Sequence, residues 1–297
     1  MRAFAWAAAA IFSFASLAGS AAAEETYAGS EMCVACHSAH SESFAKTRHG
    51  KLFTSENGLT ERMKAGCEAC HGAGGKHVAD GGGPAPEGMI AFHPETPDAV
   101  ERANGVCLDC HAGGDQLYWD GSIHDSRGLA CTTCHSAHDP KSDRNQLRAE
   151  TQAAACGTCH IVQRSQQFRN SRMPVREGHM ECGSCHNPHG AITRALITHP
   201  SINDNCQSCH ADKRGPFLWE HPPVQESCLG CHVPHGTAKR SMLRLNPPRL
   251  CQQCHVASRH PSDPRRPDET FVVGGSCLNC HPTIHGTNHP AGSFFMR

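Results

Sequence analysis

The chain has 297 residues, a formal net charge of −1, and aromatic residues at only 5% of its positions. This balance excludes a strongly basic surface for nucleic acid. With 28 glycines and 19 prolines, long helices are expected to be interrupted. A chain of this length normally buries a sizeable core of apolar side chains, which this composition does not supply by itself.

Residues 1–23 are predicted to be a cleaved export signal. Arg2 provides positive charge, residues 4–17 are mostly apolar, and three alanines at 21–23 offer a cleavage site of small residues. An uncleaved membrane anchor is disfavoured because the apolar stretch is short and this cleavage site follows it. After Glu24, no stretch of the sequence approaches the apolar length of a transmembrane helix. The sequence therefore predicts a periplasmic protein without a transmembrane segment of its own.

All 20 cysteines belong to ten copies of the motif Cys-x-x-Cys-His. The first and second cysteines of the ten motifs, in chain order, are Cys33 and Cys36, Cys67 and Cys70, Cys107 and Cys110, Cys131 and Cys134, Cys156 and Cys159, Cys182 and Cys185, Cys206 and Cys209, Cys228 and Cys231, Cys251 and Cys254, and Cys277 and Cys280. The histidines that follow them are His37, His71, His111, His135, His160, His186, His210, His232, His255 and His281. We number the motifs, and the sites that they form, from one to ten.

This motif is typical of covalent attachment of haem c, in which the two thiols form thioethers and the histidine becomes the proximal iron ligand. A zinc ribbon pairs two Cys-x-x-Cys units and does not require a histidine after each. A disulfide framework would tolerate varied spacing and would not place histidine after every second cysteine. The sequence therefore predicts ten covalent haem c groups, with the adjacent histidine as proximal ligand in each.

Ten porphyrins would provide the apolar surface that the side chains lack. The predicted fold class is a multihaem cytochrome c, with short α-helices and irregular loops around a linear array of ten haems and almost no β-sheet. The haem propionates would make the holoprotein acidic, which argues further against nucleic acid as a partner.

The motif spacing predicts a quasi-linear array in which each site contacts mainly its neighbours. From the third motif onward, successive motifs start 22 to 26 residues apart, which is too little protein to insulate one haem from the next. The two earlier intervals, of 34 and 40 residues, predict peripheral loops at 50–66 and 72–106. We expect a pentahaem half at 24–160, a junction at 161–181 and a second pentahaem half at 182–297, joined in one continuous array.

Ten of the 24 histidines are assigned as proximal ligands, which leaves fourteen candidates for ten distal positions. Bis-histidine ligation throughout is therefore numerically possible. An iron with six ligands has no vacant position for a substrate and suits electron transfer. The histidines in excess are expected to be surface residues or partners of propionates.

Several strings in the C-terminal half resemble a known family. They include Pro188-His189-Gly190, Leu218-Trp219-Glu220-His221, Cys251-Gln252-Gln253-Cys254-His255 and His285-Gly286-x-Asn288-His289-Pro290. The whole mature chain resembles the periplasmic decahaem cytochromes of the MtrA/DmsE/PioA type. The resemblance implies an electron carrier embedded in an outer-membrane β-barrel porin, serving extracellular electron transfer in metal reduction or iron oxidation. It also implies a periplasmic donor or acceptor, either a small cytochrome or an iron–sulfur protein, and a surface multihaem cytochrome as a further partner.

The resemblance also implies the distal ligands. It favours His49, His77, His124, His138, His189, His221, His235, His260, His285 and His289, and it gives less support to His40, His93, His179 and His199. The chain departs from the family at Met173-Pro174, where a His-Pro pair is expected. Either Met173 is the distal ligand of one haem, which would raise its potential, or Met173 is an apolar contact and His179 supplies the ligand.

Two other functions are weighed against the electron conduit. A multihaem oxidoreductase would need an open haem site, whereas all ten motifs are of the ordinary type and distal candidates are abundant. A free periplasmic electron shuttle would not form a stable complex with a porin. The sequence favours an electron carrier with no catalytic residues, and it does not encode the direction of electron flow.

Overall fold

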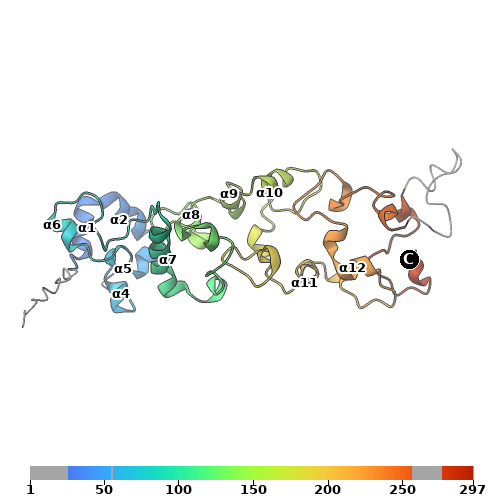
Figure 1. The fold of residues 1–297 in the computed structure, drawn as a ribbon, viewed down its shortest axis with the longest axis horizontal. Helices are drawn as coiled ribbons and strands as arrows, with labels where there is room; N and C mark the ends of the chain where they lie inside the picture. Colours follow the sequence, from blue (N-terminus) through green and yellow to red (C-terminus); the bar gives the residue numbers. More distant parts are fainter. Residues whose placement is uncertain (1–25, 55, 256–275, 297) are drawn as a thin grey trace, which may run out of the picture.

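The computed structural model describes residues 26–54, 56–255 and 276–296. These residues form short helices joined by turns along an extended molecule, and chain order follows the long axis from one end to the other (Figure 1). The described part contains no β-strand, only isolated antiparallel bridges such as His186 with Ile197. The predicted fold class is therefore confirmed. The predicted export signal lies outside the described residues.

The α-helices are α1 (Ser30–Cys36), α2 (Ser38–Ala45), α3 (Arg48–Leu52), α4 (Glu61–Lys64), α5 (Glu68–His71), α6 (Gly75–Ala79), α7 (Pro97–His111), α8 (Cys131–Cys134), α9 (Gln152–Cys156), α10 (Ile161–Gln166), α11 (Ile202–Gln207) and α12 (Pro222–Glu226). The 3₁₀ turns are η1 (Gly114–Gln116), η2 (Asp125–Arg127), η3 (Arg144–Gln146), η4 (Cys182–Ser184), η5 (Arg194–Leu196), η6 (Ala211–Lys213), η7 (Cys228–Gly230), η8 (Arg240–Met242), η9 (Cys251–Gln253), η11 (Cys277–Asn279) and η12 (Gly292–Phe294).

The third, fifth and seventh motifs begin within capped helices, α7, α9 and α11. The hydroxyl oxygens of Thr96, Thr151 and Ser201 accept hydrogen bonds from the backbone N–H groups of Ala99, Ala154 and Asp204, at 3.3, 3.1 and 3.0 Å. Such caps fix where a helix begins. The helix α7 begins inside the segment 72–106 that was predicted to be a peripheral loop. That prediction was wrong for its last third, where Thr96 and Pro97 supply a favourable helix start. It was also wrong where α6 lies in 72–106 and where α4 lies in the other predicted loop, 50–66.

Buried polar side chains connect neighbouring motifs. Asn104, which is 4% exposed, donates to the carbonyl of Leu129 at 3.0 Å and accepts from the N–H of Cys131 at 2.8 Å. Asn203 makes the equivalent contacts four motifs later, accepting from the N–H of Cys228 at 2.8 Å. Each asparagine lies three residues before one motif and holds the first cysteine of the next.

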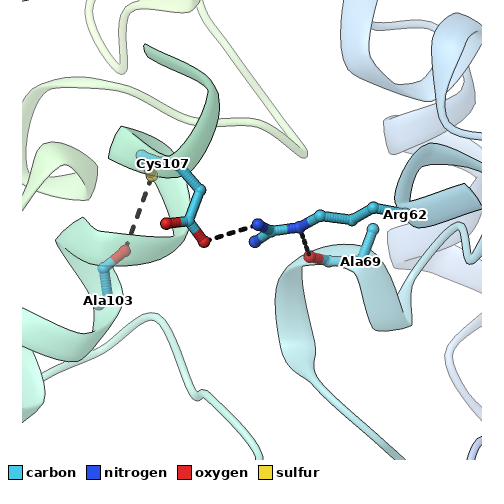
Figure 2. Close-up of polar contacts among 5 residues, drawn as sticks. Arg62, Ala69, Ala103 and Cys107 are labelled. Atoms are coloured by element: carbon cyan, nitrogen blue, oxygen red, sulfur yellow. Dashed lines mark hydrogen bonds and ion pairs between the residues drawn. The ribbon is translucent and has the colours of Figure 1, made fainter. Parts of the chain in front are cut away.

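At the N-terminal end, hydrogen bonds and an ion pair of charged side chains connect neighbouring motifs and helices. Arg62 donates to the carbonyl of Ala69 at 3.2 Å and pairs with Asp109 of α7 at 2.6 Å, which ties the second motif to the third (Figure 2). The carboxylate of Glu68, only 5% exposed, accepts three backbone N–H groups, from residues 28, 29 and 74. These contacts hold α1, α5 and α6 together.

Few apolar side chains are buried in the described part of the chain. They are Ala69, Ala103, Trp119, Ala130 and Leu147. Larger apolar residues, among them Phe168 and Ile192, are exposed. So small a core matches the prediction that porphyrin rings provide most of the apolar surface of the folded protein.

Contacts also cross the predicted junction at 161–181. Arg144 pairs with Glu181 at 3.1 Å, and the side-chain oxygen of Gln152 accepts from the N–H of Gly183 at 2.8 Å. The backbones of Ser171 and Thr237 form an antiparallel bridge. The division into two pentahaem halves stays a prediction.

Candidate haem-binding sites

Each Cys-x-x-Cys-His motif is folded as one helical turn. In the sixth motif, for example, the N–H of His186 donates to the carbonyl of Cys182 at 3.0 Å, and the same bond recurs in the other motifs outside α7. Residues three and four positions apart share one face of a helical turn. Both thiols and the imidazole therefore lie on one face, as attachment to a single porphyrin requires.

The first cysteines of consecutive motifs meet in pairs. Hydrogen bonds join the thiols of five such pairs, which are Cys33 with Cys67, Cys107 with Cys131, Cys156 with Cys182, Cys206 with Cys228, and Cys251 with Cys277. In the third pair, the hydrogen bond from Cys156 lowers the pKa of the Cys182 thiol to about 7. These pKa values belong to free thiols, and thioether formation removes them. The proximity of the motifs remains.

The second cysteine of each even-numbered motif up to the eighth lies near a cysteine of the motif after it. Burial, followed by the nearby Cys107, raises the pKa of the Cys70 thiol to about 11. The pairs Cys134 with Cys159, Cys185 with Cys206, and Cys231 with Cys254 repeat this relation further along the chain. Together with the five hydrogen-bonded pairs, these contacts make every motif a spatial neighbour of the next, from the first to the tenth.

Eight of the proximal histidines face a second histidine. The pairs and the distances between ring centres are His37 and His77 at 6.3 Å, His71 and His138 at 5.9 Å, His111 and His49 at 6.0 Å, His135 and His189 at 5.9 Å, His160 and His124 at 6.2 Å, His186 and His235 at 6.1 Å, His232 and His285 at 6.2 Å, and His255 and His221 at 6.2 Å. In each pair the second member is one of the predicted distal histidines.

These separations are too long for contact between the rings and suit an iron between them. An imidazole nitrogen lies about 1.1 Å from the ring centre and binds a metal at about 2 Å, so two imidazoles on opposite sides of one iron have centres about 6 Å apart. The residues therefore fit haem. Among the described residues there is no cluster of three or more acidic, cysteine and histidine side chains of the kind that holds a bare metal ion.

For six of the eight facing histidines, burial favours the neutral form that binds metals. Burial, and then the charge of the facing histidine, lowers the pKa of His49 and of His235. Burial is also the main cause of the lowered pKa of His138, His189, His221 and His285. The buried Nδ1 atoms of His49, His77, His138, His189 and His221 have no hydrogen-bond partner in the protein.

The remaining histidines are arranged differently. His40, His93, His179 and His289 are exposed, and Nδ1 of His289 accepts from the N–H of Ala291 at 3.1 Å. His40 lies near both His37 and His138. His199 is half-buried and its Nδ1 is hydrogen-bonded to Asn205 at 3.0 Å. The predicted ligand His260 lies outside the described residues.

The seventh and tenth sites, those of His210 and His281, are not among the eight with paired histidines. No histidine ring in the described part of the chain faces His210. The half-buried Met173 and the exposed His179 both lie in the segment before the sixth motif.

A set of carbonyl groups behind the proximal histidines was not predicted from the sequence. Nδ1 of His135, His186 and His232 bonds the carbonyls of Asn145, Ala195 and Ser241, at 2.6, 2.8 and 2.8 Å. Because a carbonyl only accepts, Nδ1 carries the proton and Nε2 is left to bind iron. The repeated signal Arg-x-x-Leu/Ile, at 144–147, 194–197 and 240–243, marks these turns in the sequence.

The glycine that follows three of the distal histidines lets the chain pass close to its neighbour. Gly190, Gly236 and Gly286 have φ of +131°, +132° and +136°, which side chains rarely adopt. A Cβ atom on Gly190 would lie 1.9 Å from the carbonyl oxygen of Tyr118. The glycine thus sets the position of the distal histidine directly before it.

The repeated attachment turns, the paired imidazoles and the small core together define a multihaem c-type cytochrome, a class of electron-transfer proteins. Models of two families match parts of the chain. A family described as a doubled CXXCH motif matches residues 173–215 and 221–260, and a family described as cytochrome c-type protein NrfB-like matches residues 67–159.

The chain belongs to the MtrA family of multihaem cytochromes, as the predicted resemblance implied. It is 38% identical over 280 residues to the multiheme cytochrome MtrA of Shewanella baltica (strain OS185), covering 91% of this chain and 81% of that protein. It is also 26% identical over 147 residues to the cytochrome c-type protein NrfB of Escherichia coli, covering 48% of this chain and 72% of NrfB. A third relative, the dissimilatory sulfite reductase MccA of Wolinella succinogenes, is 25% identical over 163 residues, covering 48% of this chain and 21% of MccA. Among the described residues, no helix has the length and apolar character needed to cross a bilayer.

Proposed function

We propose that the protein carries ten haem c groups and conducts electrons along its length. The observation that carries this proposal is the unbroken series of contacts from the first motif to the tenth. When bound, haem supplies a one-electron iron couple. The chain's own residues hold consecutive sites next to one another in chain order. The mass of the intact holoprotein tests the number of attached groups directly.

The eight facing histidines act as distal ligands in this proposal. Their role is to occupy the position where a small molecule would otherwise bind, so that each site accepts and releases electrons without performing other chemistry. Carbon monoxide tests the assignment, because it binds reduced haem only where a position is vacant. Little or no binding is expected in the wild-type protein, and His189→Gly should create one site that binds carbon monoxide. Binding at many wild-type sites would contradict the assignment.

For the seventh site we propose Met173 as the distal ligand. The fifth site faces His124, which lies before the fourth motif, and the ninth faces His221, which lies before the eighth. The corresponding segment for His210 lies before the sixth motif and contains Met173. Methionine ligation raises the potential of a haem, so one haem should be reduced well before the others. Met173→His should remove both this component and the thioether–iron charge-transfer band, whereas His179→Ala should leave both in place. The opposite pattern would assign His179.

The cellular setting that we propose is the interior of an outer-membrane β-barrel porin, entered from the periplasm after export. The family resemblance supports this setting, and the wide polar lumen of a large barrel would accommodate a long protein with a largely polar surface. The partners would be the porin, a periplasmic cytochrome or iron–sulfur protein and a surface multihaem cytochrome. Both directions of electron flow, metal reduction and iron oxidation, fit such a wire.

Liposomes that hold a reduced dye inside test the conduit. Vesicles containing the cytochrome and its porin should bleach the dye when an impermeant ferric complex is added outside, and vesicles containing either protein alone should not. The porin is identified by its co-purification with the tagged cytochrome from outer-membrane extracts. Recovery of the cytochrome only from the free periplasmic fraction would instead support an electron shuttle.

A multihaem oxidoreductase is the second candidate function. The observation in its favour is that His210 has no facing histidine in the described part of the chain, and a relative, MccA, is named a sulfite reductase. A vacant seventh site would give a high-spin signal in the oxidised protein and turnover with sulfite or nitrite. A fully low-spin spectrum and no turnover would support the electron-carrier function over the oxidoreductase.

A further inference from the structure

The ten proximal histidines fall into two classes that alternate along the chain. In every even-numbered motif, Nδ1 of the proximal histidine bonds a backbone carbonyl. These carbonyls belong to Ile90, Asn145, Ala195, Ser241 and Phe294, for motifs two, four, six, eight and ten. In the odd-numbered motifs, the proximal histidines are His37, His111, His160, His210 and His255, and no carbonyl in the described part of the chain bonds their Nδ1 atoms.

Exposure follows the same alternation. The five odd-numbered proximal histidines are exposed, and the five even-numbered ones are half-buried. An exposed Nδ1–H donates to water, which exchanges and reorients. In the even-numbered motifs, Nδ1–H donates instead to one backbone carbonyl whose position the fold fixes.

The acceptors of motifs four, six and eight are held in strained turns. Ala195 and Leu196, for example, both have φ of +58°, a left-handed conformation that costs about 1–3 kcal/mol for a residue with a side chain. Two backbone bonds hold this turn against the sixth motif, from Asn187 N–H to the Leu196 carbonyl at 2.8 Å and from Thr198 N–H to the Cys185 carbonyl at 3.0 Å. The same strained pair recurs at 145–146 and at 241–242. The fold thus maintains the acceptor position at a local energetic cost.

We propose that these carbonyls act as positioning groups that lower the reduction potential of every second haem. A histidine that donates Nδ1–H to a fixed acceptor becomes a more basic ligand through Nε2, and a more basic ligand favours the ferric state. Half-burial acts in the opposite direction, because less polar surroundings favour the less charged ferrous state. The burial of the two classes differs only moderately, so the hydrogen bond decides the order. This inference rests on the haem attachment in the proposed function and deepens it.

Alternating potentials control where electrons reside. In the half-reduced protein, electrons occupy the odd-numbered haems and oxidised haems separate them. Repulsion between electrons on adjacent sites is thereby reduced, since like charges interact less strongly at greater separation. In this state, every reduced haem has an oxidised haem next to it.

Exchange of one turn residue tests the role of the carbonyl. The side chain of Ala195 is exposed, so a substitution acts mainly through the backbone. Ala195→Val disfavours the left-handed conformation and should withdraw the acceptor from His186, while the matched control Ala195→Gly tolerates that conformation and keeps it. Potentiometry of the isolated cytochrome should show about one tenth of the haem absorbance moving to higher potential in the valine variant alone. Ser241→Val and Ser241→Gly repeat the test at the eighth site.

An unchanged or lowered potential in both valine variants, with full haem content by mass, would overturn the proposal. A second measurement needs no variant. Neighbouring ferric haems broaden each other's electron paramagnetic resonance signals, so half-reduction should convert the broad spectrum into sharp signals from isolated ferric haems. Signals that stay broad at half-reduction would mean that the oxidised haems form a contiguous block, and the alternation would be refuted. Neither measurement requires a porin, so failure of the conduit proposal would leave both results interpretable.

Discussion

The glycines that follow His189, His235 and His285 allow a graded test of how the distal histidines are positioned. Gly190, Gly236 and Gly286 share nearly the same φ, so alanine at each introduces the same backbone strain. The surroundings differ. A new Cβ would lie 1.9 Å from the carbonyl oxygen of Tyr118 at the first position and 2.2 Å from that of Gln166 at the second. At the third it would lie 2.2 Å from a ring carbon of Phe217, and a side chain moves more easily than backbone.

The expected cost follows from these two contributions. The strained conformation costs about 1–3 kcal/mol for any residue other than glycine. Forcing an extra carbon into packed surroundings adds about 1–3 kcal/mol where the neighbour is backbone, and less where a side chain rotates away. We expect Gly190→Ala to lower the free energy of unfolding by about 2–6 kcal/mol, Gly236→Ala by slightly less, and Gly286→Ala by about 1–3 kcal/mol.

Two assays measure the outcome. Thermal unfolding followed by circular dichroism gives the order of stability, and carbon monoxide binding to the reduced protein counts sites that have lost their distal histidine. Gly190→Ala should open one site, the one formed by His135 and His189. Gly105→Ala is the control, because its added carbon would meet nothing within 4 Å beyond its chain neighbours and the backbone of α7 itself. If Gly286→Ala were as damaging as Gly190→Ala, the carbonyl contact would not be the cause and the reasoning would be refuted.

Three further predictions concern the connections between sites. Asn104→Ala leaves the N–H of Cys131 without its acceptor and should destabilise the protein by about 2 kcal/mol in thermal unfolding. The control Asn57→Ala, at an exposed position, should change stability by less than about 0.5 kcal/mol. Equal effects of the two substitutions would contradict the bridging role of Asn104. Glu68→Gln replaces an acceptor oxygen with a donor facing backbone N–H groups and should cost about 1–3 kcal/mol, measured in the same way, while an unchanged midpoint would show that the carboxylate is dispensable. The facing rings are nearly parallel in five pairs, at 15–22°, and crossed in three, at 69–83°. Electron paramagnetic resonance spectra of the oxidised protein should therefore contain two classes of low-spin haem, of which the crossed pairs are the more anisotropic. A single class would contradict the ring orientations.

The sequence predicted the features that depend on covalent spacing. A motif such as Cys182 to His186 forms one turn because its chemistry and its length are local. The fold class follows in the same way, since glycine and proline limit helix length and the motifs recur closely. The helix α7 shows where this reasoning failed, because the length of the preceding interval was weighed and the capping signal of Thr96 and Pro97 was not.

Which histidines face each other across a site could not be predicted from the sequence. His71 faces His138, which lies two motifs further along, while His160 faces His124, which precedes it. Which histidine crosses to which site depends on how successive segments pack, and histidine content alone permits many solutions. The Arg-x-x-Leu/Ile repeat marks the turn at Ala195, but its left-handed conformation could not be predicted, because alanine has no preference for that conformation and only its neighbours hold it there.

The contacts between consecutive motifs have a consequence for how such proteins change in evolution. Each thiol pair, such as Cys156 with Cys182, joins an odd-numbered motif to the even-numbered motif that follows it, and the next pair repeats the arrangement. A duplication or deletion of two motifs would therefore preserve every local junction and leave both ends of the molecule unaltered. The number of motifs in the chain would then change in steps of two. In the conduit proposed above, such steps would lengthen or shorten the path that the electrons follow.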